Sequence, residues 1–140
     1  MLYAETSAVV AWLLEERRGM KAAQAIAAAD AVVASDLTLI EADRALRRVA
    51  RLDAAGDAAV GAGQRRLVDA TATWAIERIS PPVVERARLP FLDDAIRSLD
   101  AIHLATAVVL RAAGVELDIL SLDERVRSNG RALGFRVVPD

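Results

Sequence analysis

The sequence predicts an α/β fold with a central, mostly parallel sheet between layers of helices. Apolar, strand-like segments alternate with segments of helical periodicity, a pattern that implies βα units joined by right-handed crossovers. Hydrophobic residues make up 54% of the chain, enough to form a sizeable core. The length of 140 residues fits one domain, so we expect residues 1–140 to fold as a single unit.

In the first half of the chain, the apolar runs and breaker residues separate two strands from four helices. Thr6 and Ser7 are the expected cap of the first helix, and Ser35 and Asp36 are the expected cap of the third. The expected strands are 1–5 and 31–34, and the expected helices are 8–16, 20–29, 36–52 and 57–72.

In the second half, Pro81 stands where the first turn of a helix tolerates proline, Ser98 is a natural cap, and Gly114 ends a helix. The expected strands are 74–79, 117–122 and 135–138, and the expected helices are one that starts at Pro81, then 99–113 and 123–133.

Composition limits the classes of function. Without cysteine the chain forms neither disulfides nor thiolate metal sites. The N-terminus lacks the positive start of a signal peptide, and the apolar run 8–14 is too short to span a membrane, so we expect a cytoplasmic protein without a membrane partner. A net charge of −2 gives no overall attraction for nucleic acid, so RNA binding must rest on local arginine clusters. The apolar excess also favours a buried dimer or partner interface.

Four acidic residues stand where the predicted elements begin or end. Glu5 ends the first strand, Glu41 lies in the second turn of the helix after the second strand, Asp100 lies in the first turn of its helix, and Asp123 follows the strand 117–122. Because ligands of parallel α/β sheets bind beyond the carboxyl ends of the strands, these side chains can converge there. Such a cluster repels itself unless a cation neutralises it, and oxygen ligands select Mg²⁺ or Mn²⁺.

Each acid also has a simpler interpretation. Asp100 and Asp123 stand at helix starts, where acids favour the helix dipole. Glu41 could pair with Arg44 or Arg48 on an exposed face. Glu5 closes an inner strand, where a charge needs either a partner or a metal.

The segments that carry the four acids resemble the motifs of PIN-domain ribonucleases, especially VapC-type toxins of type II toxin–antitoxin systems. RSLDAIHLATA is the most specific match, and the four segments together span nearly the whole chain in order. The matching segments are Met1–Val10 (MLYAETSAVV), Ser35–Arg48 (SDLTLIEADRALRR), Arg97–Ala107 (RSLDAIHLATA) and Leu120–Gly134 (LSLDERVRSNGRALG).

The resemblance implies a PIN-like three-layer fold and an enzyme that hydrolyses RNA with a metal-activated water. It implies that Glu5, Glu41, Asp100 and Asp123 are both catalytic and metal-binding, with Mg²⁺ or Mn²⁺ as cofactor. The implied partners are substrate RNA and a cognate antitoxin, with a homodimer and a toxin–antitoxin hetero-oligomer as assemblies.

One position departs from this pattern, because the first acid of the family is ordinarily aspartate and here it is Glu5. The extra methylene moves the carboxylate by ~1 Å, whereas a working site tolerates roughly 0.5 Å. We therefore expect weakened activity, and the alternative is a PIN fold that binds RNA or protein without cleaving.

Several residues are expected to support the acids without binding the metal: Thr6, Ser7, His103 and Ser121. His103 matches a position that is often histidine in these toxins. Asp43 and Asp118 are not expected to be ligands, since Asp43 points about 200° away from Glu41 on a helix and Asp118 lies within a strand. The candidate RNA-phosphate contacts are Arg44, Arg48, Arg125 and Arg127, from arginine clusters that also include Arg47, Arg51 and Arg131.

Two other enzyme classes with acidic pockets fit less well. A signalling receiver domain needs a lysine late in the chain, and the only lysine is Lys21. A phosphatase with an Asp-x-Asp nucleophile needs a second acid two positions after the first, where this chain has Ser7.

Overall fold

A computed structural model describes residues 1–52, 57–93 and 96–139 and confirms the α/β fold. Within these residues a five-stranded, entirely parallel sheet has the order β3-β2-β1-β4-β5, so β1 is the central strand. The strands are β1 (Leu2–Ala4), β2 (Val32–Ser35), β3 (Ala75–Glu77), β4 (Asp118–Leu120) and β5 (Val137–Val138).

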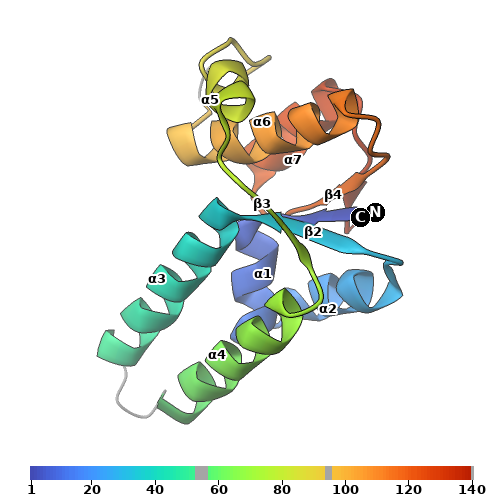
Figure 1. The fold of residues 1–140 in the computed structure, drawn as a ribbon. Coiled ribbons are helices and arrows are strands. Elements are labelled where there is room, and N and C mark those ends of the chain that lie inside the picture. Colours follow the sequence, from blue (N-terminus) through green and yellow to red (C-terminus); the bar gives the residue numbers. More distant parts are fainter. Residues whose placement is uncertain (53–56, 94–95, 140) are drawn as a thin grey trace.

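Helices cover both faces of the sheet, which gives the three layers expected of a PIN-like fold (Figure 1). The first group, α1 to α4, lies on one face, and α5 to α7 lie on the other. The helices are α1 (Thr6–Leu13), α2 (Gly19–Ala28), α3 (Asp36–Leu52), α4 (Asp57–Thr71), α5 (Pro81–Ala87), α6 (Ser98–Ala112) and α7 (Glu124–Ala132).

The inner strands divide their side chains between two cores because successive residues of a strand point to opposite faces. Tyr3 and Val33 pack with Leu104 under α6, whereas Ala4 and Ala34 pack with the helices of the other layer. All four residues are at most 1% exposed. This burial on both faces explains why β1 is apolar throughout and β2 is apolar up to Ser35.

Two helix starts differ from the sequence-based expectation. Helix α1 begins at Thr6, and its cap is the carboxylate of Glu5, which accepts the backbone N–H of Ser7; Thr6 and Ser7 are not the cap. Helix α6 begins at Ser98, so the capping position is Arg97, whose backbone N–H donates to Asp100 at 3.3 Å. In both helices an acidic side chain accepts a backbone N–H at the start of the helix.

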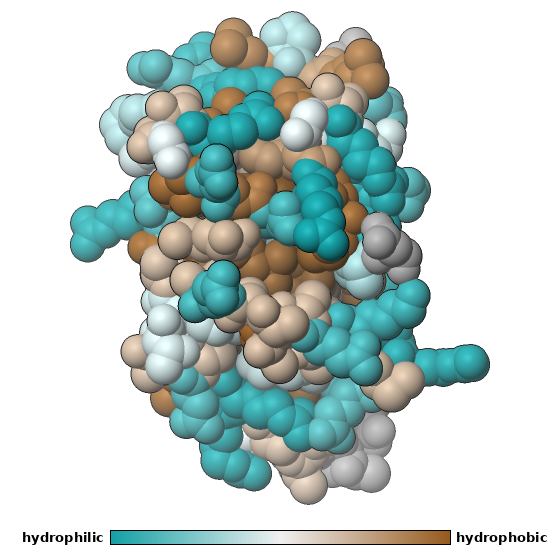
Figure 2. Space-filling model, turned by 90° about the vertical axis from the view of Figure 1, so that its right-hand side faces the viewer, coloured by the Kyte–Doolittle hydropathy of each residue, from teal (hydrophilic) through white to brown (hydrophobic). Residues whose placement is uncertain are grey.

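The sheet has its amino-terminal edge on the side turned away from α3 (Figure 1). Viewed from that side, hydrophobic side chains gather in a band at the level of the sheet, with hydrophilic side chains above and below it (Figure 2). Among the described residues, no helix is both long enough and apolar enough to cross a membrane.

Candidate active site

The structure places the four predicted acids around the carboxyl edge of the sheet. Glu5 directly follows β1, and Asp123 lies just beyond β4, the strand paired with β1. Glu41 lies in the second turn of α3, which follows β2, and Asp100 lies in the first turn of α6. Parallel pairing of β2, β1 and β4 brings these chain ends to the same edge, where the acids form two connected pairs, Glu5 with Glu41 and Asp100 with Asp123.

Glu5 is almost fully buried, at 4% exposure, and both of its carboxylate oxygens accept hydrogen bonds. Oε1 accepts the backbone N–H of Ser7 at 2.9 Å. Oε2 accepts the hydroxyl of Ser121 at 2.7 Å and also that of Ser7. The Ser7 oxygen in turn accepts the backbone N–H groups of Leu122 and Asp123, at 2.8 and 3.0 Å. Glu5 and Ser7 thus join the start of α1 to the turn between β4 and α7.

Glu41 belongs to a second set of hydrogen bonds, centred on the buried His103 of α6. Its Oε2 accepts the hydroxyl of Thr6 at 2.7 Å and lies 2.9 Å from Nε2 of His103. Because an ionised carboxylate only accepts, Nε2 carries the hydrogen and donates it to Glu41. The other ring nitrogen, Nδ1, lies 2.9 Å from the hydroxyl of Tyr3, which fixes the orientation of the ring.

His103 also connects the two sets, since its Nε2 lies 4.0 Å from Oε1 of Glu5. Burial raises the pKa of Glu41, but the hydrogen bonds from His103 and Thr6 and the charge of the imidazole outweigh burial and bring that pKa below its ordinary value. Burial raises the pKa of Tyr3 far above its ordinary value, so the phenol stays neutral. The site therefore keeps Glu41 ionised and the Tyr3 phenol neutral.

Asp100 and Asp123 are connected through Arg125. The Arg125 backbone N–H donates to Oδ1 of Asp123 at 2.8 Å, which caps α7, and its Nε lies 3.7 Å from Oδ2 of Asp100. At 3.7 Å this contact is an ion pair without a hydrogen bond, and the buried Nε has no hydrogen-bond partner among the described residues. Arg125 thus neutralises part of the acidic charge at the mouth of the site.

A hard divalent cation is compatible with these residues in the kind of donor they offer, namely carboxylate oxygens from four different elements. Within residues 1–52, 57–93 and 96–139, however, no three acidic or histidine side chains stand together as a ligand group. Protein donors also occupy the carboxylates of Glu5, Glu41 and Asp123. Binding an ion here requires these side chains to exchange protein donors for the metal.

The four predicted supporting residues all contact the acids. Thr6 and His103 bind Glu41, while Ser7 and Ser121 bind Glu5. The two acids that were not expected to be ligands lie elsewhere, since Asp43 is exposed on α3 and Asp118 pairs with Arg136 at 3.0 Å.

The predicted RNA-phosphate contacts fall into two kinds. Arg44 and Arg48 are exposed on α3. Arg125 and Arg127 are partly buried and already have protein partners: Arg125 pairs with Asp100, and Arg127 donates to the Ser121 carbonyl at 2.8 Å. Among these four predicted contacts, only Arg44 and Arg48 have no ion pair or side-chain hydrogen bond within the described part of the chain.

Sequence reasoning missed Tyr3 and Ser35, which extend the His103 network: the Tyr3 hydroxyl donates to Ser35 Oγ at 3.3 Å. A tyrosine in a short apolar strand is ordinarily a core residue, so the sequence carried no signal for this role. The partner, His103, is 100 residues away in the chain.

Comparison with known proteins identifies the family and the fold. The PIN domain family model matches residues 2–132. The fold is similar to that of the toxin VapC20 of Mycobacterium tuberculosis, described as cleaving the sarcin-ricin loop, with a TM-score of 0.68 and 20% sequence identity over 100% of both chains. No curated protein gives a significant sequence match. Because the family model covers nearly the whole sequence, this chain belongs to the PIN domain family.

Proposed function

We propose that this protein is a ribonuclease toxin of a toxin–antitoxin module, hydrolysing RNA phosphodiester bonds with Mg²⁺ or Mn²⁺. The observation that carries this proposal is the gathering of Glu5, Glu41, Asp100 and Asp123 at one edge of a parallel sheet in a PIN-domain chain. Structural similarity to a toxin that cleaves the sarcin-ricin loop supports RNA as the substrate class.

In this proposal the four carboxylates hold the ion, which when bound supplies an activated water and offsets negative charge on the phosphodiester. The chain's own residues position these ligands. His103 donates to Glu41 and is itself oriented by Tyr3, while Thr6 donates to the same Glu41 oxygen. Partners of this kind fix the rotamer of a ligand, and their loss typically lowers metal affinity or activity by about 10- to 100-fold.

Of the four proposed ligands, Glu5 has the most hydrogen bonds to the protein, since its carboxylate accepts three from Ser7 and Ser121. We propose that this weakens its hold on the metal and reduces turnover relative to an aspartate at the same position. Replacement of Glu5 by Asp should then raise the RNA cleavage rate and the metal affinity together. Unchanged values for both would refute this role.

The same three hydrogen bonds to Glu5 support a second candidate function, in which the PIN fold binds RNA or a partner protein without cleaving RNA. Single-turnover cleavage of labelled RNA with Mg²⁺ or Mn²⁺ separates the two functions. We expect the wild-type protein to cleave, Asp100→Asn to lose at least about 100-fold in rate, and Asp43→Asn to match the wild type. A wild-type rate no higher than that of Asp100→Asn would establish the non-cleaving function.

We further propose that residues 1–140 act as one cytoplasmic PIN domain that forms a homodimer and a hetero-oligomer with a cognate antitoxin. Expression of the protein alone should arrest growth, and co-expression of the product of the neighbouring small open reading frame should relieve the arrest. Growth without arrest would argue against the toxin role.

A further inference from the structure

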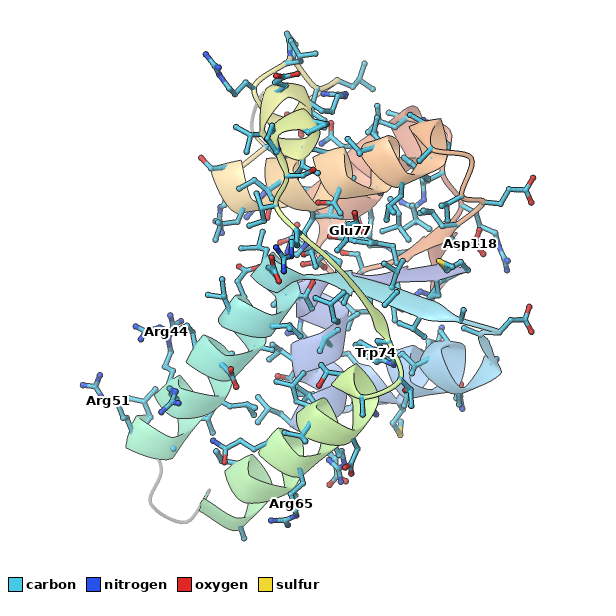
Figure 3. The ribbon with its side chains drawn as sticks, in the orientation of Figure 1. Arg44, Arg51, Arg65, Trp74, Glu77 and Asp118 are labelled. Carbon is cyan, nitrogen blue, oxygen red and sulfur yellow. The ribbon has the colours of Figure 1, made fainter. Side chains whose placement is uncertain are left out.

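Four exposed arginines form one continuous face of α3, here called the arginine face. Figure 3 shows that Arg44 and Arg51, near its two ends, project from the outer side of α3, away from α4. None of the four forms an ion pair or a side-chain hydrogen bond with any residue that the structure describes. The arginine face consists of Arg44, Arg47, Arg48 and Arg51.

The arginine face begins one turn beyond Glu41 and continues along the same side of the helix. At 3.6 residues per turn, Arg44, Arg48 and Arg51 point within about 80° of the direction of Glu41, and Arg47 within about 120°. At 1.5 Å per residue, Arg44, Arg48 and Arg51 lie about 4.5, 10.5 and 15 Å along the axis from Glu41. Glu41 and three of the four arginines thus lie within one sector of about 80° along α3, with Arg47 beside it.

The charges of the arginine face are uncompensated in the protein. Arg44, Arg48 and Arg51 follow one another at spacings of four and three residues, where like charges weaken a helix by about 0.2–0.5 kcal/mol per pair. Elsewhere, arginines near the site have acidic partners; for example, Arg125 pairs with Asp100. An unpaired row of guanidinium groups is suited to a ligand with regularly repeated negative charges, and the phosphate backbone of RNA is such a ligand.

The aromatic residues favour recognition of the backbone over recognition of the bases. Tyr3, Phe91 and Phe135 are buried, and Trp12 and Trp74 stack on each other with ring centroids 5.8 Å apart. All five aromatic residues belong to the described part of the chain, and none of them presents a fully exposed ring on which a base could stack. Binding through the arginine face alone should be strongly dependent on salt and tolerant of sequence.

We propose that the arginine face holds the RNA strand on one side of the cleaved bond, so that the strand runs from Glu41 outward along α3. This inference rests on the proposed ribonuclease function and adds to it the path of the substrate. The arginines farthest from the acids, Arg48 and Arg51, test the path without touching the site.

The experiment measures binding of a fluorescein-labelled single-stranded RNA by anisotropy, in the presence of a chelator so that no cleavage occurs. The protein is the full chain, either wild type, Arg48→Gln/Arg51→Gln, or the matched control Arg65→Gln/Arg88→Gln. Both control arginines are exposed and lie on other parts of the fold; Arg65 projects from α4 (Figure 3). The two double variants lose the same total charge.

We expect the α3 double variant to bind RNA at least about tenfold more weakly at low salt. The slope of log affinity against log salt should fall by about 1.4, which corresponds to two lost phosphate contacts on a single strand. The control should stay within about twofold of the wild type. Equal weakening of the two variants would overturn the path along α3, even if the wild type cleaves RNA in an Asp100-dependent manner.

The remaining outcomes also decide the question. If the arginine face binds a polyglutamate peptide while RNA affinity and its salt slope are the same in all three proteins, the face docks an acidic protein segment and the RNA path is wrong. If the wild type neither binds nor cleaves RNA, both the inference and the proposed function fail. Circular dichroism of each variant confirms that the fold is retained.

Discussion

Replacement of Glu5 by Gln is expected to destabilise the folded protein even when no metal is present. The buried carboxylate of Glu5 accepts three hydrogen bonds, from the backbone of Ser7 and from the hydroxyls of Ser7 and Ser121. Hydrogen bonds to a charged group contribute about 1.5–3 kcal/mol each, against about 0.5–1.5 kcal/mol for neutral pairs. The glutamine amide keeps the length but has one acceptor oxygen in place of two, so about 3 kcal/mol is lost. Relief from burying a charge offsets about 1 kcal/mol.

The net loss of about 2 kcal/mol is measured by urea unfolding in a chelator at neutral pH, followed by circular dichroism. For a chain of this length it corresponds to a decrease in Tm of about 8 °C. The control, Glu5→Asp, keeps the charge and can still cap α1 through Ser7, so about 1 kcal/mol should be lost with the Ser121 contact.

The opposite result would refute the reasoning. If Glu5→Gln is more stable than the wild type in chelator, then Glu5 is a carboxylate repelled by its acidic neighbours, which only a metal can neutralise. Its three protein donors would then be insufficient to hold the charge.

Three further predictions concern the pH dependence and the packing of the fold. Because folding lowers the pKa of Glu41, the contribution of Glu41 to stability is present above the ordinary glutamate pKa and is lost as the pH falls through that range. Glu41→Gln should therefore flatten the acid side of the stability profile, measured by urea unfolding in chelator between roughly pH 3 and pH 6. A Cβ on Gly19 would lie 2.1 Å from the Ala11 carbonyl oxygen, so Gly19→Ala should lower the free energy of unfolding by at least about 3 kcal/mol. In the control Gly61→Ala the Cβ meets only a side-chain atom at 3.6 Å, so this variant should be neutral or stabilised by up to about 1 kcal/mol. Similar melting temperatures for the two variants would contradict the close approach of α1 and α2. The buried side chain of Asn129 accepts the backbone N–H of Asp93 and donates to the Arg125 carbonyl one turn earlier in α7, so Asn129→Ala should lower the free energy of unfolding by about 2–3 kcal/mol. A loss below about 0.5 kcal/mol would show that these bonds contribute little.

The order of strands and helices could be predicted from the sequence because the local signals agree with the fold. Apolar runs such as 31–34 are flanked by helix caps and breakers, and the structure has β2 at Val32–Ser35 and α3 directly after it. The position of the acids also followed from the pattern. Once all strands are parallel, residues after β1 and β4 must meet at one edge.

The partners of each side chain could not be predicted, because they depend on contacts between residues far apart in the chain. Thr6 and Ser7 fit the local rule for a helix cap, but Glu5 caps α1 because its longer side chain reaches Ser7 and also Ser121, which is 116 residues away. The same holds for His103, whose orientation is fixed by Tyr3 from the central strand. The spacing of residues along the chain predicted where the acids lie, but it did not predict which groups donate hydrogen bonds to them.

The central claim is that acids from separate elements hold one divalent ion, and equilibrium binding of Mn²⁺, followed by electron paramagnetic resonance, tests it most directly. The wild-type protein should bind Mn²⁺, Glu41→Gln and Asp100→Asn should each weaken binding by at least about tenfold, and Asp43→Asn should leave it unchanged. Absence of Mn²⁺ binding by the wild type, or equal affinity in all four proteins, would contradict the proposed metal site.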